Sequence, residues 1–205
     1  MNKLSKDQIE AASKVLGRAF QDDPLFIHCF SDPIEKKRKI TIHCEYMILL
    51  GMVSGEVYIT SSNIEGVAVW HPYGIKDQTI RNHSKDIIRR LRNARKEDFS
   101  DPLVLERISK FEEIANNFQK EHVNFPHWYL SIIGVDPKYQ AMGYASKLLK
   151  RKLAEIDKQN LPCFLHTENG NNVQTYEHFG FKMIGKMKVP NTNFHFHGML
   201  RKEMK

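Results

Sequence analysis

The sequence predicts an α/β protein in which strands and helices alternate along a single domain, residues 1–205. Short runs rich in β-branched and aromatic residues alternate with longer segments whose apolar residues recur at helical spacing. With 41% hydrophobic residues, the chain is also long enough to bury one sizeable core. There is no internal repeat and no low-complexity linker, so we expect one domain.

The N-terminal part of the chain is expected to contain two helices and a β-hairpin. The first helix has apolar residues along one stripe and stops before the Asp23-Pro24 pair. The hairpin consists of two apolar, β-branched runs separated by polar turn residues. The expected elements are helices at residues 5–20 and 33–50 and strands at residues 57–60 and 66–70.

The C-terminal part is expected to alternate strand and helix and to end in two strands. Its strand signals are apolar or alternating runs, and its helices follow turn residues. The expected elements are strands at residues 127–135, 163–167, 181–189 and 194–200 and helices at residues 144–158 and 171–179.

Residues 73–125 contain no convincing strand and are expected to form two or three helices inserted between the hairpin and the next strand. Insertions of this kind often line or cover a functional site. This helical insertion is therefore interpreted either as a substrate lid or as a structural support.

The formal net charge of +7 is concentrated between Arg81 and Lys96, where seven basic residues face one acid. Apolar residues at helical spacing place these charges on the outer face of an amphipathic helix. Such a face could bind RNA or an acidic membrane, or could simply be solvated. No aromatic residue interleaves the basic run as a base-stacking platform would require, so we expect no nucleic-acid partner.

Composition and hydropathy indicate a cytoplasmic protein. The cysteines, Cys29, Cys44 and Cys163, are three in number and lie far apart, so neither a disulfide framework nor a zinc knuckle is predicted. The N-terminus lacks the apolar segment of a signal peptide, and the best apolar run, residues 46–53, is too short to span a bilayer. We expect no membrane partner, and either a monomer or a homodimer.

The stretch from Gly134 to Ala145 predicts an anion site between a strand and a helix. If the strand ends at Val135 and the helix begins near Gly143, the loop amides are left unpaired and point outward. Gly143 permits close approach of a ligand because it has no Cβ. A pyrophosphate would suit this loop, although a glycine at such a turn can also serve turn geometry alone.

Two motifs together resemble the signature of the Gcn5-related N-acetyltransferase (GNAT) superfamily. Gln140, Gly143 and Ala145 match its Gln/Arg-x-x-Gly-x-Gly/Ala turn, which cradles the pyrophosphate of acetyl-CoA. The later family pattern is matched by Asn172, Tyr176, Glu177, Gly180 and Phe181. Within the superfamily, the stretches AFQDDPLF, GVAVWHP and HWYLSIIGVDP look like the puromycin N-acetyltransferase branch.

The resemblance implies a mixed, mostly antiparallel central sheet flanked by helices. This chain departs from the family at its N-terminus, where the usual first strand has little room before residue 5. The resemblance also implies direct transfer of an acetyl group from acetyl-CoA to a primary amine of a small molecule in a ternary complex. Strand 127–135 would pair with the pantetheine arm, and the neighbouring strand at residues 162–167 would splay away from it. The implied cosubstrate contacts are Ile133, Gly134, Val135, Gln140, Ala141, Met142, Gly143, Tyr144, Ala145, Ser146, Asn172 and Tyr176.

The same resemblance implies that Tyr176 is the general acid for the departing thiolate, with packing of its ring on the sheet as the alternative. The general base departs from the family pattern, because His166 stands where the puromycin-type branch typically has a glutamate. An imidazole can accept the amine proton directly or through water, but a structural role for His166 is equally open. The rival bases are Glu168, His127, His195 and His197.

The remaining candidates concern metal and substrate. His195 and His197 share one face of a strand, a spacing that could bind a metal, but two histidines are too few and we expect no metal. Cys163 is expected to be a packed core residue. Asp22, Asp23 and Glu45 are possible partners for a cationic amine. The competing class is a non-catalytic acyl-CoA sensor or an RNA-binding module on the same fold.

Overall fold

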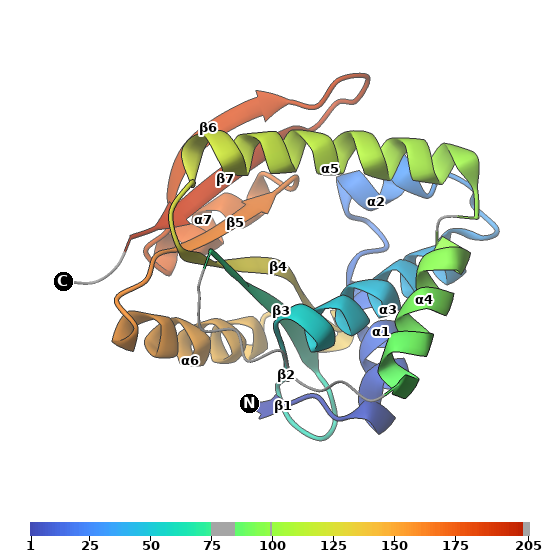
Figure 1. The fold of residues 1–205 in the computed structure, drawn as a ribbon, viewed down its shortest axis with the longest axis horizontal. Coiled ribbons are helices and arrows are strands. Elements are labelled where there is room, and N and C mark those ends of the chain that lie inside the picture. The colour runs from blue at the N-terminus through green and yellow to red at the C-terminus, as the bar shows by residue number, and fades with distance from the viewer. Residues whose placement is uncertain (75–84, 99, 203–205) are drawn as a thin grey trace.

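The computed structural model describes residues 1–74, 85–98 and 100–202 as an α/β fold built around a seven-stranded sheet (Figure 1). The strand order is β1-β2-β3-β4-β5-β7-β6, and neighbouring strands are antiparallel except for the parallel pair β4 and β5. The predicted fold class is therefore confirmed. The strands are β1 (Asn2–Lys3), β2 (Glu56–Ile59), β3 (Gly66–Tyr73), β4 (His127–Val135), β5 (Cys163–Thr167), β6 (Lys182–Lys188) and β7 (His195–Arg201).

Helices cover both faces of this sheet because successive strand residues point to opposite sides. In β3, Val67 and Val69 join the core beneath α1 and α3, whereas Ala68 and Trp70 join the core beneath α6. The helices are α1 (Ile9–Ala19), α2 (Pro24–Cys29), α3 (Lys36–Ser54), α4 (Lys85–Asp98), α5 (Pro102–His122), α6 (Tyr144–Lys158) and α7 (Asn171–His178), with 3₁₀ turns at Lys6–Gln8 and Pro137–Tyr139. Among the described residues, none of these helices combines the length and hydropathy needed to cross a membrane.

Two elements differ from the sequence prediction for identifiable reasons. Helix α2 was not predicted, although its signals are present: Pro24 opens it, and Asp23 Oδ1 accepts from the amides of Leu25 and Phe26. Strand β3 runs past the predicted end at residue 70, because beyond Trp70 it pairs with β4 alone, and proline is tolerated where a strand has an unpaired side.

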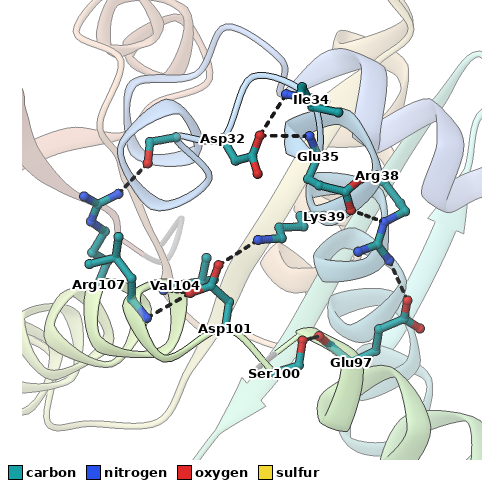
Figure 2. A network of polar contacts seen from close by, with 12 residues as sticks. Asp32, Ile34, Glu35, Arg38, Lys39, Glu97, Ser100, Asp101, Val104 and Arg107 are labelled. Atoms are coloured by element: carbon teal, nitrogen blue, oxygen red, sulfur yellow. Dashed lines mark hydrogen bonds and ion pairs between the residues drawn. The ribbon is translucent and has the colours of Figure 1, made fainter.

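The helical insertion contains α4 and α5, as predicted, and residues 75–84 lie outside the described residues. Arg81, the first residue of the predicted basic segment, falls in that range. Ion pairs hold the corner between α4 and α5 against α3 (Figure 2). Arg38 Nη1 lies 2.7 Å from Glu97 Oε1, and Lys39 Nζ lies 2.7 Å from Asp101 Oδ2. The insertion is thus fixed to the N-terminal helices at its corner.

Helix α5 is also held on the C-terminal strands by one aromatic ring. Phe118 is buried and packs on Phe164 and Phe196. A Cβ on Gly198 would lie 2.2 Å from Phe118 Cε1, and one on Gly185 would lie 2.6 Å from its Cε2. The two glycines therefore form the slot that lets α5 approach β6 and β7.

We predict that Gly198→Ala lowers the free energy of unfolding by roughly 2–3 kcal/mol, because the added methyl group overpacks a filled slot. In a Phe118→Ala background the same change should cost much less, because the ring that it meets is gone. Urea denaturation of the wild type, both single variants and the double variant measures this coupling. Additive effects of the two changes on the free energy of unfolding would contradict the close contact between Phe118 and Gly198.

Candidate active site

Strands β4 and β5 part in the middle of the sheet. Their parallel pairing covers Trp128 to Leu130 on one strand and Cys163 to Leu165 on the other. Beyond these pairs β4 continues to Val135 and β5 to Thr167, without further pairing between the two strands. The edge of β4 that faces β5 therefore leaves backbone hydrogen-bonding groups from Ser131 onward for another partner.

A β-bulge lies at the point where the strands part. On β3, Val69 pairs with Ile132 and Trp70 pairs with Leu130, so Ser131 is the extra residue on β4. A bulge bends a strand and increases its local twist. We infer that this bulge directs the second half of β4 away from β5 and opens the space between them.

In the loop after β4, helix α6 begins beside Gly143, as the sequence predicted. This residue has φ +81° and is the N-cap of α6, and Ala141 is also left-handed with φ +61°. A Cβ built on Gly143 would have no atom within 4 Å, so open space lies on that side of the backbone. The amides at the start of α6 border this space, which suits an anion.

Two contacts hold the loop against the rest of the sheet. Arg18 Nε from α1 donates to Asp136 Oδ2 at 3.0 Å, and Asp136 is buried. Gln140 Nε2 donates to the carbonyl of Val135 at 3.2 Å. The side of Gly134 that lacks a Cβ faces Leu16 and other residues of α1, so this glycine serves helix packing.

A cavity of about 490 Å³ lies beside the parted strands. Its walls come from α2, α3, α5, β3, β4, β5 and α7, and α5 contributes six residues of the helical insertion. Among the predicted site residues, Ile133, His166, Asn172 and Tyr176 line the cavity. The 140–146 loop is not part of its lining.

A chain of hydrogen bonds runs along one wall of the cavity. Tyr129 Oη lies 2.8 Å from His166 Nε2, and His166 Nδ1 lies 2.8 Å from Glu168 Oε1. A carboxylate only accepts, so Nδ1 carries the proton toward Glu168 and Nε2 accepts from the Tyr129 hydroxyl in the neutral imidazole. Burial, together with the nearby carboxylates Glu168 and Glu112, raises the pKa of Tyr129.

Asp23 also lines the cavity and lies close enough to this chain to be affected by the charges of Glu168 and His166. The pKa of Asp23 is raised to about 6, chiefly by burial and also by the negative charge of Glu168, against the lowering effect of the α2 amides and of His166. Two carboxylates thus share one desolvated region.

Tyr176 is buried at the C-terminal end of α7 and packs edge-on against Phe181. Its ring lines the cavity, and burial with the charges of Glu168 and Asp23 raises the pKa of its hydroxyl. Its phenol is therefore protonated at neutral pH, the form that can donate a proton.

Of the rival base candidates, His127, His195 and His197 do not line the cavity, whereas Glu168 does. His127 is buried with both nitrogens engaged: Nδ1 at 2.7 Å from the Phe125 carbonyl and Nε2 at 2.8 Å from Gln119 Nε2. His197 Nδ1 lies 3.0 Å from the Thr167 carbonyl, and His195 is not among the lining residues. Glu168, the remaining rival, is the partner of His166.

Of the three acids predicted to bind a cationic amine, only Asp23 lines the cavity. Asp23 lines the cavity, whereas Asp22 does not, and Glu45 is paired with Arg90 of α4 at 2.9 Å. Cys163 is fully buried in the core. Among the described residues, no three histidine, cysteine or acidic side chains gather into a group that could hold a metal.

Sequence reasoning missed Tyr129 and His71. Tyr129 looked like one residue of an apolar strand, and only the pairing of β4 with β5 brings it to His166. His71 lines the cavity, with Nδ1 at 3.1 Å from Ser54 Oγ, and burial lowers the pKa of its imidazole to about 4. With that pKa, His71 is a poor acceptor for an ammonium proton.

Comparisons with known proteins agree with this geometry. Residues 111–202 match the acetyltransferase (GNAT) domain. The chain is 27% identical over 184 residues to an uncharacterized N-acetyltransferase of Schizosaccharomyces pombe, covering 86% of this chain and 71% of the relative.

Two solved structures share the fold. One is the histone acetyltransferase HPA2 and related acetyltransferase of Corynebacterium glutamicum, with TM-score 0.67, 19% identity and coverage of 100% of this chain and 96% of that one. The other is the NatC complex bound to Gag peptide and CoA, with TM-score 0.51, 14% identity and coverage of 99% and 97%. At these identities the likeness concerns the fold alone. Together the matches support a GNAT-type acetyltransferase domain, whereas the likeness to the puromycin branch stays a prediction.

The raised pKa of Asp23 predicts that Asp23→Asn stabilises the protein at neutral pH. Asparagine caps a helix as well as aspartate does. The folded-state pKa of about 6 lies above the ordinary value of 3.8, so the wild type loses stability as pH rises through this interval. The variant should gain about 1–2 kcal/mol at pH 7.5, after allowance for partial exposure, and almost nothing near pH 3.5.

Urea denaturation at the two pH values measures the difference, and all other titrating groups are common to both proteins. Asp32→Asn is the matched control, because Asp32 is exposed and its Oδ1 accepts from the amides of Ile34 and Glu35 in the same way. An Asp23→Asn gain of equal size at both pH values would contradict a desolvated carboxylate.

Proposed function

We propose that this chain is an acetyl-CoA-dependent N-acetyltransferase that transfers an acetyl group to the primary amine of a small molecule in a ternary complex. One observation carries the proposal: the parted strands β4 and β5 leave a free backbone edge that leads into a cavity containing a Tyr129-His166-Glu168 chain and Tyr176. Amine acetylation needs a place for an amide-rich thioester, a proton acceptor and a proton donor, and each is available there.

The residues present fit the cosubstrate. The backbone of Ile133, Gly134 and Val135 would pair with the pantetheine arm along the free edge of β4. The loop would hold the pyrophosphate through its amides, and the open space beside Gly143 leaves room for it. The loop residues assigned to this task are Gln140, Ala141, Met142, Gly143, Tyr144, Ala145 and Ser146, with Asn172 nearer the thioester. When bound, acetyl-CoA supplies an activated acetyl group.

His166 is proposed to remove a proton from the substrate ammonium through Tyr129. The Tyr129 hydroxyl accepts the amine proton while it gives its own proton to His166 Nε2, so the phenol oxygen stays neutral and the raised pKa of Tyr129 is no obstacle. Glu168 holds Nδ1 and stabilises the imidazolium that forms. The imidazolium afterwards releases its proton to solvent.

The neutral amine then attacks the thioester carbonyl, so that a C–N bond forms and the C–S bond breaks. Tyr176 donates its proton to the departing sulfur, and the second proton of the attacking nitrogen restores the phenol. One proton is released overall for each ammonium converted into an amide. A cysteine nucleophile is not required, which agrees with the burial of Cys163 and the raised pKa of its thiol.

A small acceptor is favoured over a polypeptide by the shape of the site. Six residues of helix α5 line the cavity wall: Ile108, Phe111, Glu112, Ala115, Asn116 and Gln119. The cavity volume of about 490 Å³ is that of a small-ligand pocket. The helical insertion thus acts as a lid in this proposal.

The test is a panel of amines, polyamines, aminoglycosides and peptides incubated with acetyl-CoA, with thiol release and acetylated product both measured. Product that depends on a small amine supports the proposal. Tight acetyl-CoA binding without product from any amine would replace it with an acyl-CoA sensor. Binding of RNA at submicromolar concentration and physiological salt would favour the RNA-binding alternative, because contacts through the basic helix alone fade as salt rises.

We predict that Gly143→Ala weakens acetyl-CoA binding by at least about tenfold. An alanine at φ +81° is strained by about 1–2 kcal/mol, and its methyl group would enter the space assigned to the phosphates. Calorimetry measures the affinity. Gly180→Ala is the matched control, since Gly180 has φ +85° and a Cβ there would meet only the Arg201 side chain at ordinary contact distance. Unchanged affinity in a folded Gly143→Ala protein would remove the loop assignment.

We also predict that variants of the two proton-transfer residues, Tyr176 and His166, lose activity with different acceptors. Tyr176→Phe should lower kcat by roughly 10²–10⁴ with every acceptor while leaving acetyl-CoA affinity nearly intact. His166→Gln should lower kcat by a similar factor when the acceptor is an ammonium ion at the assay pH. The loss should be far smaller with a weakly basic amine that is already neutral. An equal loss with both acceptors would reduce His166 to a structural residue.

A further inference from the structure

Apart from histidines, tyrosines and a cysteine, the ionisable side chains that line the cavity are all acidic. Asp23, Glu112 and Glu168 line it, and the lining contains no lysine or arginine among the described residues. This contrasts with the chain as a whole, whose formal net charge is +7. Asp23 and Glu168 are largely removed from water, whereas Glu112 is exposed. Two carboxylates that share a desolvated region are costly unless a cation enters it.

Two of these carboxylates each keep one oxygen available. Asp23 uses Oδ1 to accept from the amides of α2, and Glu168 uses Oε1 to bind His166. The described residues give no hydrogen bond to Asp23 Oδ2 or Glu168 Oε2. Because Glu168 raises the pKa of Asp23, the two groups are close enough to repel each other, and a cation between them would relieve that repulsion.

The wall beyond Asp23 is apolar and aromatic. Phe20 and Phe26 stack with their ring centroids 4.8 Å apart, and Phe30 follows at 5.9 Å from Phe26. All three line the cavity, together with Tyr46 from α3 and Phe111 from the lid helix α5. Such a wall favours an apolar or aromatic body and leaves hydroxyl groups without partners.

We propose, on the premise of the transferase function above, that the acceptor is a monoamine with an apolar, aromatic-sized body, whose ammonium group is attracted into the cavity by the charges of Asp23 and Glu168. Asp23 is then the residue that determines specificity for the charge. Amino acids are excluded because their carboxylate would face the same two acids. Sugars that carry amines are disfavoured because the aromatic wall beside Asp23 offers few hydrogen-bond partners for their hydroxyls.

The test is a binding measurement, so it does not depend on turnover. Calorimetry on the full chain with CoA present would compare 2-phenylethylamine with 2-phenylethanol, L-phenylalanine and 1,4-diaminobutane. We expect 2-phenylethylamine to bind at least about tenfold more tightly than each of the others, since each lacks the charge, adds a carboxylate or lacks the ring. Equal binding of the alcohol, or tighter binding of the diamine, would overturn the proposal.

Two variants test whether Asp23 causes the preference for the amine. Asp23→Asn keeps the helix cap and should remove most of the preference for the amine over the alcohol, whereas Asp32→Asn, an exposed cap of the same geometry, should leave it unchanged. A preference that survives in Asp23→Asn would overturn the assignment. If the amine binds as described but no acetyl group is transferred, the transferase function fails and the cation site stands. If acetyl transfer occurs with diamines or amino acids only, the transferase function stands and the acceptor class fails.

Discussion

Strands β4 and β5 hydrogen-bond over three residue pairs and then separate, and the position of the site depends on this separation. The extra residue, Ser131, lies opposite β3 at the same level of the sheet. A continuous ladder would have consumed the backbone groups of Ser131 to Val135 and closed the cavity. Because these groups need partners, an amide-rich ligand that runs along β4 is the natural complement to the fold.

The rest of the chain holds this opening in place. Helix α1 packs closely on the second half of β4 at Gly134, and its Arg18 binds Asp136 at the start of the loop. On the other side, Phe118 fixes helix α5 on β6 and β7. Asp23 and Glu168 are largely removed from water in the cavity, so their charges act strongly on neighbouring groups, as the raised pKa values of Asp23 and Tyr176 indicate.

Local patterns predicted most of the fold because strand alternation, helical stripes and turn residues are encoded within short windows. The two-residue strand β1 agrees with the expectation of little room at the N-terminus. Features that depend on pairing were not predictable: the bulge at Ser131, and the contact of Tyr129 with His166, which joins residues 37 positions apart. Helix α2 was missed because Asp23-Pro24 was interpreted only as a stop. The roles of Tyr176, His166 and the loop residues stay predictions.

Hydrogen exchange of the backbone amides tests the central claim most directly. With saturating acetyl-CoA, we expect slower exchange in peptides that cover residues 131–135 and 141–146, because the cosubstrate would pair with the free edge of β4 and bind the loop amides. The first half of β4, which already pairs on both sides, should change little. Unchanged exchange in residues 131–135 at saturation would contradict the account, whatever happens elsewhere in the chain.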